Sequence, residues 1–426
     1  MFRWILIVGA GLCLDMAVSA QTLHEAVAAA YNQNPRISAQ RQTTAQAQER
    51  ISQARGQRRL NLTASGSMGF ESVDSNRPFG VETGERSVVQ AQLEASLPVY
   101  TGGRIQASIR QAEAGYRAAE ADFDGLVQTL LLDTVTAYLD VYRDRETLSL
   151  RANSVELLSQ QLRAAEDRFE VGIVTRTDVA QSRARLEGAR ASLAAAQASL
   201  EASYADFTAL TGSFPGELQA DIAIPVLYES LEEALHVAVQ NSPELISARE
   251  SERAASEAII VAKSALKPTV SVVGTAQAQE TYDTNYRDTS ISALTQARIP
   301  LFQGGVLQSQ IRSARLQRDT ARFQIDSLTR QIRAQIAQAW YGHIAALSAI
   351  EASQRQIEAA KIAFEGAQEE LAVGVRTTLD VLDQEQDFLN ARLSGIEAQR
   401  DAVVSAYQLL RVTGQLNLSR FGIESR

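Results

Sequence analysis

The chain contains one unit twice, and this repeat limits the possible fold more than any other feature of the sequence. Motifs of the first half return in the second half in the same order and with matching spacing. They are LPVYTGG at 97–103 and IPLFQGG at 299–305, VG at 171–172 and 373–374, TDV at 177–179 and LDV at 379–381, and LTG at 210–212 and VTG at 412–414. Shared order and spacing indicate duplication of a unit of about 200 residues.

Proline positions predict very long helices in each half. No proline lies between Pro98 and Pro215, and none follows Pro300. Because proline breaks a helix interior, these stretches permit long helices, and we expect Gly172 and Gly374 to interrupt them. We expect helices over 22–56, 104–171 and 176–211 in the first half, and over 230–266, 306–373 and 376–412 in the second. Each of the longest helices would extend about 100 Å.

The repeat divides the chain into five segments. We expect a signal peptide at 1–20, a first repeat at 21–212 with a β-hairpin at 58–101, a linker at 213–229, a second repeat at 230–414 with a β-hairpin at 267–303, and a tail at 415–426. In the first segment, Arg3 precedes a short apolar run, and 18–20 form a small-residue cleavage site. The bulky Leu12 before Cys13 favours cleavage over lipidation. The chain is therefore predicted to be exported.

A coiled-coil seam is predicted near the C-terminal end of each long helix. Apolar residues there are alternately three and four positions apart, and the second half keeps this spacing. They are Val155, Leu158, Leu162, Ala165 and Phe169, with Ile357, Ala360, Phe364, Ala367 and Leu371 as equivalents. Such spacing is typical of knobs-into-holes packing. An ordinary amphipathic helix explains one stripe but not its repetition in helices this long.

Four extended segments alternate apolar and polar residues. The apolar faces hold Leu60, Leu62, Ala64, Met68 and Phe70; Val89, Ala91, Leu93, Ala95 and Leu97; Val270, Val272, Ala276 and Ala278; and Ile291, Ala293, Ala297 and Ile299. Each strand is expected to be about 10–12 residues long, enough to cross a membrane at a tilt. One apolar and one polar face indicates a barrel with lipid outside and water inside, although a soluble β-sandwich shares the pattern. The polar segments 72–86 and 280–289 are interpreted as external loops.

Four strands are too few to close a transmembrane barrel, since such barrels start at about eight strands. Several copies of the chain are therefore expected to contribute. After residue 20 there is no apolar run long enough for a membrane-spanning helix, so any spanning part is expected to be β.

Composition excludes several classes of function. The net charge is −9 and no basic stripe is visible, which argues against a nucleic-acid partner. Cys13 is the only cysteine, and it lies in the predicted signal peptide. His24, His236 and His343 each stand alone in helical sequence without a second ligand at metal-binding spacing. We therefore expect neither an enzyme nor a resident cofactor or metal.

With these features the sequence closely resembles the TolC family of outer-membrane efflux channels over residues 22–414. The duplicated halves, the Pro-x-x-x-Gly-Gly segments, the Val-Gly turns and the DVLD motif at 380–383 carry the resemblance. It implies an α+β membrane protein in which a long α-helical coiled-coil barrel continues into a transmembrane β-barrel. It also implies a homotrimer with four strands per protomer, seated in the outer membrane with its helical tunnel in the periplasm.

The Gly-Gly segments are predicted to join strand to helix. Proline ends a strand without needing a ladder donor, and a glycine pair lets the backbone turn into the helix. The predicted junction residues are Pro98, Gly102, Gly103, Pro300, Gly304 and Gly305, and the predicted turns at the helical tips are at Gly172 and Gly374. A phosphate-binding role for these glycines is disfavoured because the longer Gly-rich fingerprint is missing.

Two pairs of charged residues are the candidate site. Asp380 and Asp383 are three positions apart on one helical face, and from spacing alone a solvated face is the preferred interpretation. The resemblance implies instead that they ring the narrowest part of the channel entrance. It also implies that Asp178 and Arg376 belong to a polar network that holds the entrance closed. The tyrosine that the family's best-known member uses in this network is replaced by Leu371.

We therefore interpret the chain as a passive exit duct of a tripartite efflux pump or a type I secretion system. Its expected partners are outer-membrane lipid, a periplasmic adaptor (membrane fusion) protein, an inner-membrane pump that is ABC-type or proton-driven, and an exported protein or small molecule. The alternative is a periplasmic coiled-coil scaffold or tether without transport activity, against which the four alternating segments speak. A periplasmic adaptor would instead surround one helical hairpin with β-rich domains.

Overall fold

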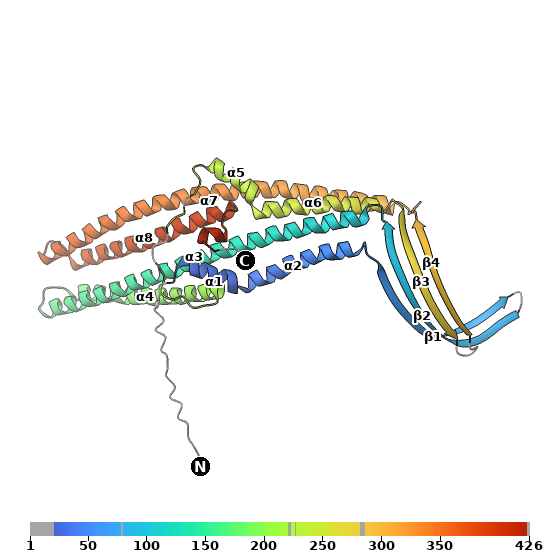
Figure 1. Cartoon of the computed structure of the whole chain (residues 1–426). Helices are drawn as coiled ribbons and strands as arrows, with labels where there is room; N and C mark the ends of the chain where they lie inside the picture. The colour runs from blue at the N-terminus through green and yellow to red at the C-terminus, as the bar shows by residue number, and fades with distance from the viewer. Residues whose placement is uncertain (1–20, 78–79, 220–222, 226, 282–285, 424–426) are drawn as a thin grey trace, which may run out of the picture. The chain divides into compact units, whose positions relative to one another are not determined.

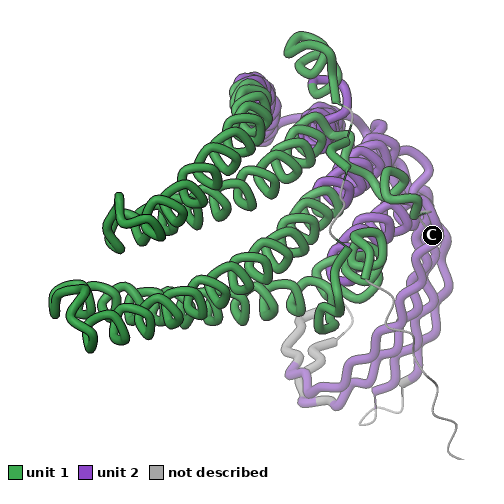
Figure 2. Tube along the Cα trace, turned by 90° about the vertical axis from the view of Figure 1, so that its left-hand side faces the viewer, with its two compact units in different colours: residues 1–37, 126–238, 334–426 green, residues 38–125, 239–333 purple. Residues whose placement is uncertain are grey.

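The computed structural model describes residues 21–77, 80–219, 223–225, 227–281 and 286–423, so the predicted signal peptide at 1–20 lies outside the described residues. The chain forms two compact units, and each takes segments from both halves of the sequence (Figure 2). Unit 1 comprises the described residues up to 37, 126–238 and those from 334 onward. Unit 2 comprises 38–125 and 239–333. The predicted division into two sequential repeats therefore differs from the division into units, and its boundaries stay a prediction.

Two helices of equal length continue from unit 2 into unit 1. These are α3 (Arg104–Glu170) and α7 (Val306–Ala372), each of 67 residues (Figure 1). A tight turn follows each one, and then α4 (Arg176–Thr211) or α8 (Thr378–Val412) begins. These bounds lie within two residues of the helices that proline and glycine positions predict. No helix among the described residues is long and apolar enough to cross a membrane.

The first helix predicted in each half is in fact two helices, which corrects the expectation of single helices over 22–56 and 230–266. The structure has α1 (Leu23–Gln33) followed by α2 (Pro35–Gly56), and α5 (Leu231–Asn241) followed by α6 (Pro243–Ser264). Asn34 has ψ 124° and Ser242 has ψ 118°. Both precede a proline, whose ring pushes the preceding residue out of the helical region. The proline then opens the next helix, where its missing N–H costs nothing.

In unit 2, four antiparallel strands form one sheet in the order of the sequence. They are β1 (Asn61–Arg77), β2 (Gly80–Tyr100), β3 (Thr269–Thr281) and β4 (Tyr286–Arg298) (Figure 1). The register places Leu93 opposite Ala64 and Ala276, and places Gln92 opposite Ser65 and Gln277. Because directly opposed residues share a face of a sheet, the predicted apolar and polar faces each continue across these strands.

The strands are longer than predicted, and the segment 72–86 is not simply a loop. β1 and β2 have 17 and 21 residues, and β3 and β4 have 13 each, against the expected 10–12. The ladder continues through the polar stretch, with Ser72 opposite Glu85. Ladder bonds join backbone groups, so polar side chains do not end them. In the second hairpin, Thr281 pairs with Tyr286, and 282–285 lie outside the described residues.

The junctions between strands and helices depend on glycine at one close approach. Gly102 has φ +64°, and a Cβ there would lie 2.8 Å from Cβ of Lys267 and 3.0 Å from the carbonyl oxygen of Ser264. Gly103 also has a positive φ, as have Gly304 and Gly305 in the second half. Pro98 does not end its strand as expected, since β2 continues to Tyr100 across a register shift between these two residues.

The core of unit 1 forms around Tyr138 of α3 and Phe207 of α4, both fully buried, with Ala26, Val141 and Leu200. The Tyr138 hydroxyl lies 2.8 Å from the carbonyl oxygen of Gln21 and 3.1 Å from that of Gln219, and it accepts a hydrogen bond from the Gln219 N–H at 2.8 Å. One buried hydroxyl therefore joins two separate extended segments to α3.

Replacing Tyr138 by Phe is expected to lower the free energy of unfolding by about 1 kcal/mol, because the backbone groups of Gln21 and Gln219 lose a hydrogen-bond partner. The measurement is guanidinium unfolding followed by circular dichroism. Tyr341→Phe is the control, since Tyr341 is 63% exposed and its hydroxyl should contribute little. Equal losses in the two variants would contradict the role given to the Tyr138 hydroxyl.

Candidate functional site

The two turns that carry the candidate residues have the same backbone design. After α3, Gly172 has φ 79° and the N–H of Ile173 donates to the carbonyl of Arg168 at 2.9 Å. After α7, Gly374 has φ 78° and the N–H of Val375 donates to the carbonyl of Glu370 at 2.9 Å. A positive φ with this bond is the usual glycine end of a helix. The turns predicted at Gly172 and Gly374 therefore lie at equivalent places in unit 1.

Asp178 and Asp380 both occupy the third position of a helix and close a capping box. Asp178 accepts hydrogen bonds from the N–H and the hydroxyl of Thr175, at 2.8 and 2.9 Å. Asp380 accepts the same pair from Thr377, at 3.0 and 2.7 Å. The box satisfies backbone groups that the first turn of a helix leaves unpaired. Each aspartate therefore helps to start the helix that follows its turn.

The hydrogen bonds from the Thr377 backbone and side chain hold the pKa of Asp380 below its ordinary value, with a smaller contribution from Arg376. Asp380 is therefore ionised at neutral pH. The sequence carries a signal for this role that our interpretation did not use, since Thr-x-x-Asp at 175–178 and 377–380 is a recognisable capping pattern.

Asp383 joins two helical hairpins through an ion pair. Its carboxylate lies 2.6 Å from a guanidinium nitrogen of Arg185 in α4, and both side chains are about half exposed. Leu382, the neighbouring residue on α8, is buried against Leu158 of α3 and Leu186 of α4. The predicted acidic pair therefore splits into two roles, because Asp380 belongs to a helix cap and Asp383 to a link between hairpins.

The predicted partners Asp178 and Arg376 are not brought together within the described residues of one chain. Arg376 forms an ion pair with Glu370 of α7, while Asp178 bonds Thr175. A contact between neighbouring copies lies outside a single chain, so the predicted latch stays a prediction.

Glu385, which the sequence analysis did not single out, lies buried two residues beyond Asp383. Its side chain is on the face of α8 that meets α3, and one oxygen accepts from the hydroxyl of Ser154 at 3.4 Å. The other oxygen has no hydrogen-bond partner among the described residues. Burial raises the pKa of Glu385 to about 7, against a smaller lowering effect of the Ser154 hydroxyl. Only the tertiary contact with α3 distinguishes this glutamate from a surface one.

Glu385 makes the packing of α8 on α3 dependent on pH. Its pKa is raised in the packed state, so this state holds a proton that the unpacked state loses above pH 4.5. Its stabilising contribution is complete below about pH 4.5, falls as pH rises, and is lost above about 7. We expect the wild type to melt at a lower temperature at pH 8 than at pH 5, and Glu385→Gln to reduce this difference.

The control is Glu358→Gln, which removes an exposed carboxylate from α7. It should keep the pH dependence of the wild-type melting temperature. A Glu385→Gln variant with the wild-type pH dependence would show that Glu385 is not the titrating group.

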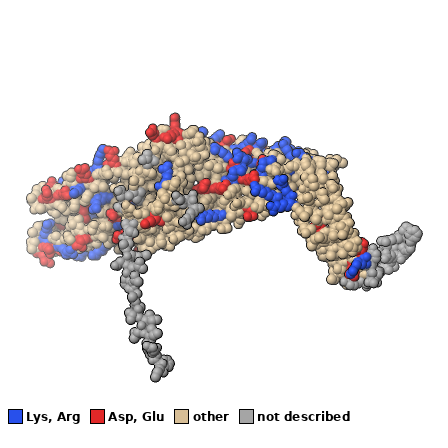
Figure 3. Space-filling model, in the orientation of Figure 1, with Lys and Arg blue, Asp and Glu red and all other residues tan. Residues whose placement is uncertain are grey.

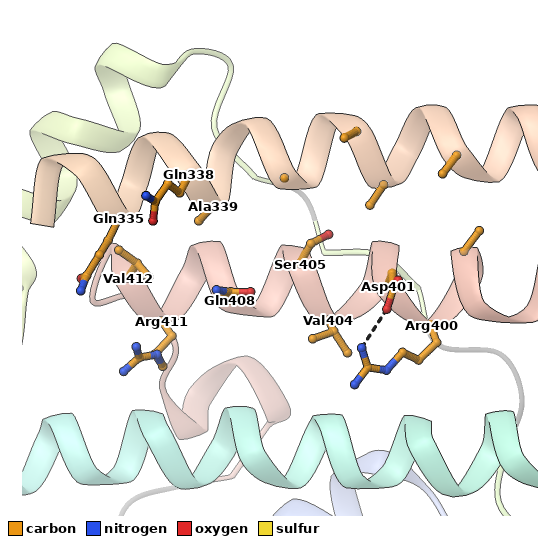
Figure 4. A pocket seen from close by; sticks show the side chains of 15 residues that line it. Gln335, Gln338, Ala339, Arg400, Asp401, Val404, Ser405, Gln408, Arg411 and Val412 are labelled. Atoms are coloured by element: carbon orange, nitrogen blue, oxygen red, sulfur yellow. Dashed lines mark hydrogen bonds and ion pairs between the residues drawn. The ribbon is translucent and has the colours of Figure 1, made fainter. Parts of the chain in front are cut away.

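A groove of about 620 Å³ lies elsewhere in unit 1, between α7 and α8 (Figure 4). Five alanines, one glycine and three glutamines are among its fifteen lining residues, and the ion pair drawn in the figure joins Arg400 to Asp401 at 2.8 Å. Small residues of this kind suit the close approach of a helix. No group of three acidic, histidine or cysteine side chains in the described part of the chain could hold a metal ion.

The family model of the outer membrane efflux proteins matches residues 26–213 and 234–415, which is most of the chain. The chain belongs to this family. It is 29% identical over 410 residues to the outer membrane efflux protein BepC of Brucella suis, which covers 96% of this chain and 88% of that protein. It is 24% identical to the outer membrane protein TolC of Escherichia coli, over 78% of this chain and 70% of that protein.

Solved structures agree on the fold. The Campylobacter jejuni CmeC outer membrane channel superposes with a TM-score of 0.80 at 18% identity, covering 93% of this chain and 88% of that one. The predicted fold class is thereby confirmed. As an outer membrane efflux protein the chain is a channel component in the outer membrane with its helical part in the periplasm, and it is not an enzyme.

Proposed function

We propose that three copies of the chain assemble into one passive exit duct. The supporting observation is the open sheet: β1 pairs with β2 only and β4 with β3 only, so one chain leaves two strand edges without a partner among its described strands. Backbone groups that face hydrocarbon must be paired, and only closed barrels achieve this with strands. Three copies supply enough strands for a closed barrel of the smaller transmembrane kind.

The energy for transport comes from outside the chain in this proposal. An inner-membrane pump, joined through a periplasmic adaptor, would dock at the end of the duct that bears the Val-Gly turns and open it. Efflux of small molecules and export of proteins both fit a passive duct, and the name of BepC, an efflux protein, favours the first as the cargo to test.

Leu93→Arg tests the face of the sheet that meets lipid. Leu93 lies on the apolar face with Ala64 and Ala276, so a charge there should cost about 2–4 kcal/mol near the middle of the membrane. The matched control is Gln92→Arg, one residue away on the polar face. The measurement is the yield of trimer in detergent by light scattering. Equal yields, or a stable folded monomer of the wild type, would contradict the closed barrel.

We further propose that Asp380 and Asp383 line the narrow entrance of this duct. In a threefold assembly their carboxylates would meet near the axis, and rings of acidic side chains favour cations. Arg185 offsets part of this charge, because its guanidinium already pairs with Asp383. Among the described residues, Asp380 forms no such ion pair, so it should contribute more to the field than Asp383.

The gate is tested by single-channel recording in planar bilayers. Asp380→Asn with Asp383→Asn should weaken cation selectivity and block by multivalent cations, since two carboxylates per chain lose their charge. Asparagine can still accept the Thr377 N–H, so the helix cap survives. Arg185→Gln should strengthen both properties, because Asp383 loses its counter-charge.

Arg183→Gln is the matched control, because Arg183 pairs with Glu166 of the same hairpin at 2.8 Å. It removes the same charge from α4 and should leave selectivity unchanged. Unchanged selectivity in the double asparagine variant would return both aspartates to a solvated helical face. We also propose that Asp178 and Arg376 belong to a polar network that holds this entrance closed.

A further inference from the structure

The sequence around each strand–helix junction holds positive charge only. In the windows 50–70, 95–112, 258–279 and 289–318, every charged residue is Lys or Arg, although the whole chain has a net charge of −9. These basic residues are Arg50, Arg55, Arg58, Arg59, Arg104, Arg110, Lys263, Lys267, Arg298, Arg312, Arg315 and Arg318. The four windows come from distant parts of the chain, so their common charge needs a spatial explanation.

The strand register brings the four junctions to one end of the sheet. At this end of the sheet lie three antiparallel pairs: Asn61 with Ser96, Tyr100 with Val270, and Thr269 with Arg298. Direct contacts join neighbouring junctions. Arg104 donates to the Gln57 side chain at 3.3 Å, and Gly102 lies against Lys267. The basic residues therefore form one belt, and Figure 3 shows blue atoms gathered where the helices meet the largely uncharged surface of the sheet.

Much of this belt has no counter-charge. Arg58, Arg59, Lys263 and Lys267 are exposed, and no acidic side chain in the described part of the chain pairs with them. Three other members do have an acidic partner: Arg55 pairs with Glu113 at 3.0 Å, Arg110 with Glu257 at 2.8 Å and Arg318 with Asp319 at 2.8 Å. A cavity of about 420 Å³ opens between the end of α2 and the start of α3, lined by Arg55, Arg58 and Arg59 with Gln106, Ile109 and Glu113. The cavity thus presents two unpaired guanidinium groups beside a buried apolar side chain.

Exposed apolar side chains lie directly beside these charges. Leu60 follows Arg59 and is 61% exposed, and Leu266 precedes Lys267 and is 43% exposed. In the fourth junction, Leu301 and Phe302 are about nine-tenths exposed. Apolar side chains next to unpaired cations match the boundary between hydrocarbon and phosphate groups in a membrane.

We propose that this basic belt binds the phosphate groups of anionic phospholipids in the periplasmic leaflet of the outer membrane. The family places the sheet in the outer membrane and the helices in the periplasm, so the junctions lie at that surface. Arginine matches phosphate oxygens through paired N–H donors, and each Lys or Arg near an anionic membrane surface adds to the attraction. The belt would fix the depth of the channel in the membrane.

The experiment uses the full-length protein in detergent with equal amounts of phosphatidylglycerol and phosphatidylcholine. Mass spectrometry of the lipid that stays bound gives the ratio of anionic to zwitterionic lipid. The wild type should prefer phosphatidylglycerol. Arg58→Gln, Arg59→Gln and Lys267→Gln in one variant should reduce this preference by about tenfold or more at low salt. Added salt should weaken it in the wild type.

Two further variants separate charge from folding. Arg58→Lys, Arg59→Lys and Lys267→Arg together keep the charge and should keep the preference. Arg163→Gln, Arg190→Gln and Arg355→Gln remove the same charge from exposed helix positions and should also keep it. A glutamine variant of the belt that still prefers phosphatidylglycerol would overturn the proposal.

Two more measurements test whether the belt recognises phosphate and whether it acts independently of the proposed gate. Inorganic phosphate should weaken the preference more than chloride of equal ionic strength does, because it competes with the lipid phosphate for the same guanidinium and ammonium groups. Equal effects of the two salts would show charge screening alone and would contradict phosphate recognition. The belt variant should keep the wild-type cation selectivity in planar bilayers. Loss of lipid preference with unchanged selectivity therefore separates this inference from the proposed gate.

Discussion

The two open edges of the β1–β4 sheet are the constraint on which the rest of this protein depends. Each edge strand offers backbone donors and acceptors that no other described strand of the chain satisfies. In water such an edge is tolerable, but in hydrocarbon every unpaired group costs several kcal/mol. A sheet with lipid on its apolar face is therefore stable only in a closed ring of copies. In the proposed trimer, symmetry would bring equivalent hairpins of the three chains around one axis, where their aspartates would act as one ring.

Regular patterns in the sequence were sufficient to predict the long helices and the faces of the strands. Helices α3 and α7 follow from proline-free stretches, and the faces of the strands follow from strict alternation around Leu93 and Gln92. The errors came from local backbone effects. The break at Asn34 depends on the residue before proline, which the apolar pattern does not register. The segment 72–86 was assigned to a loop because it is polar, but backbone pairing does not depend on side-chain polarity.

The candidate site could be predicted only in part, for a similar reason. Asp178, Asp380 and the two turns are local features, and their spacing is visible in the sequence, although their capping role was missed. Arg185 and Glu385 are different, because each acquires its role from another helix. Nothing near Arg185 in the sequence indicates Asp383, and Glu385 differs from surface glutamates only by its burial against α3. The roles of these two residues depend on contacts between segments that are distant in the sequence, and local spacing does not show such contacts.

Differences between the two duplicated halves also make the contacts between hairpins unequal in charge. Aligning the two halves at their turns pairs Arg185 with Asp387 and Asp383 with Gln181. The contact from α4 to α8 within one chain therefore has a cation opposite an anion. In the proposed trimer, the equivalent contact from α8 of one chain to α4 of the next would have Asp387 near Gln181, which cannot form that ion pair. In the proposed trimer, the two halves of one ancestral unit would keep the same backbone, but the Arg185–Asp383 ion pair would occur only in the contact within a chain.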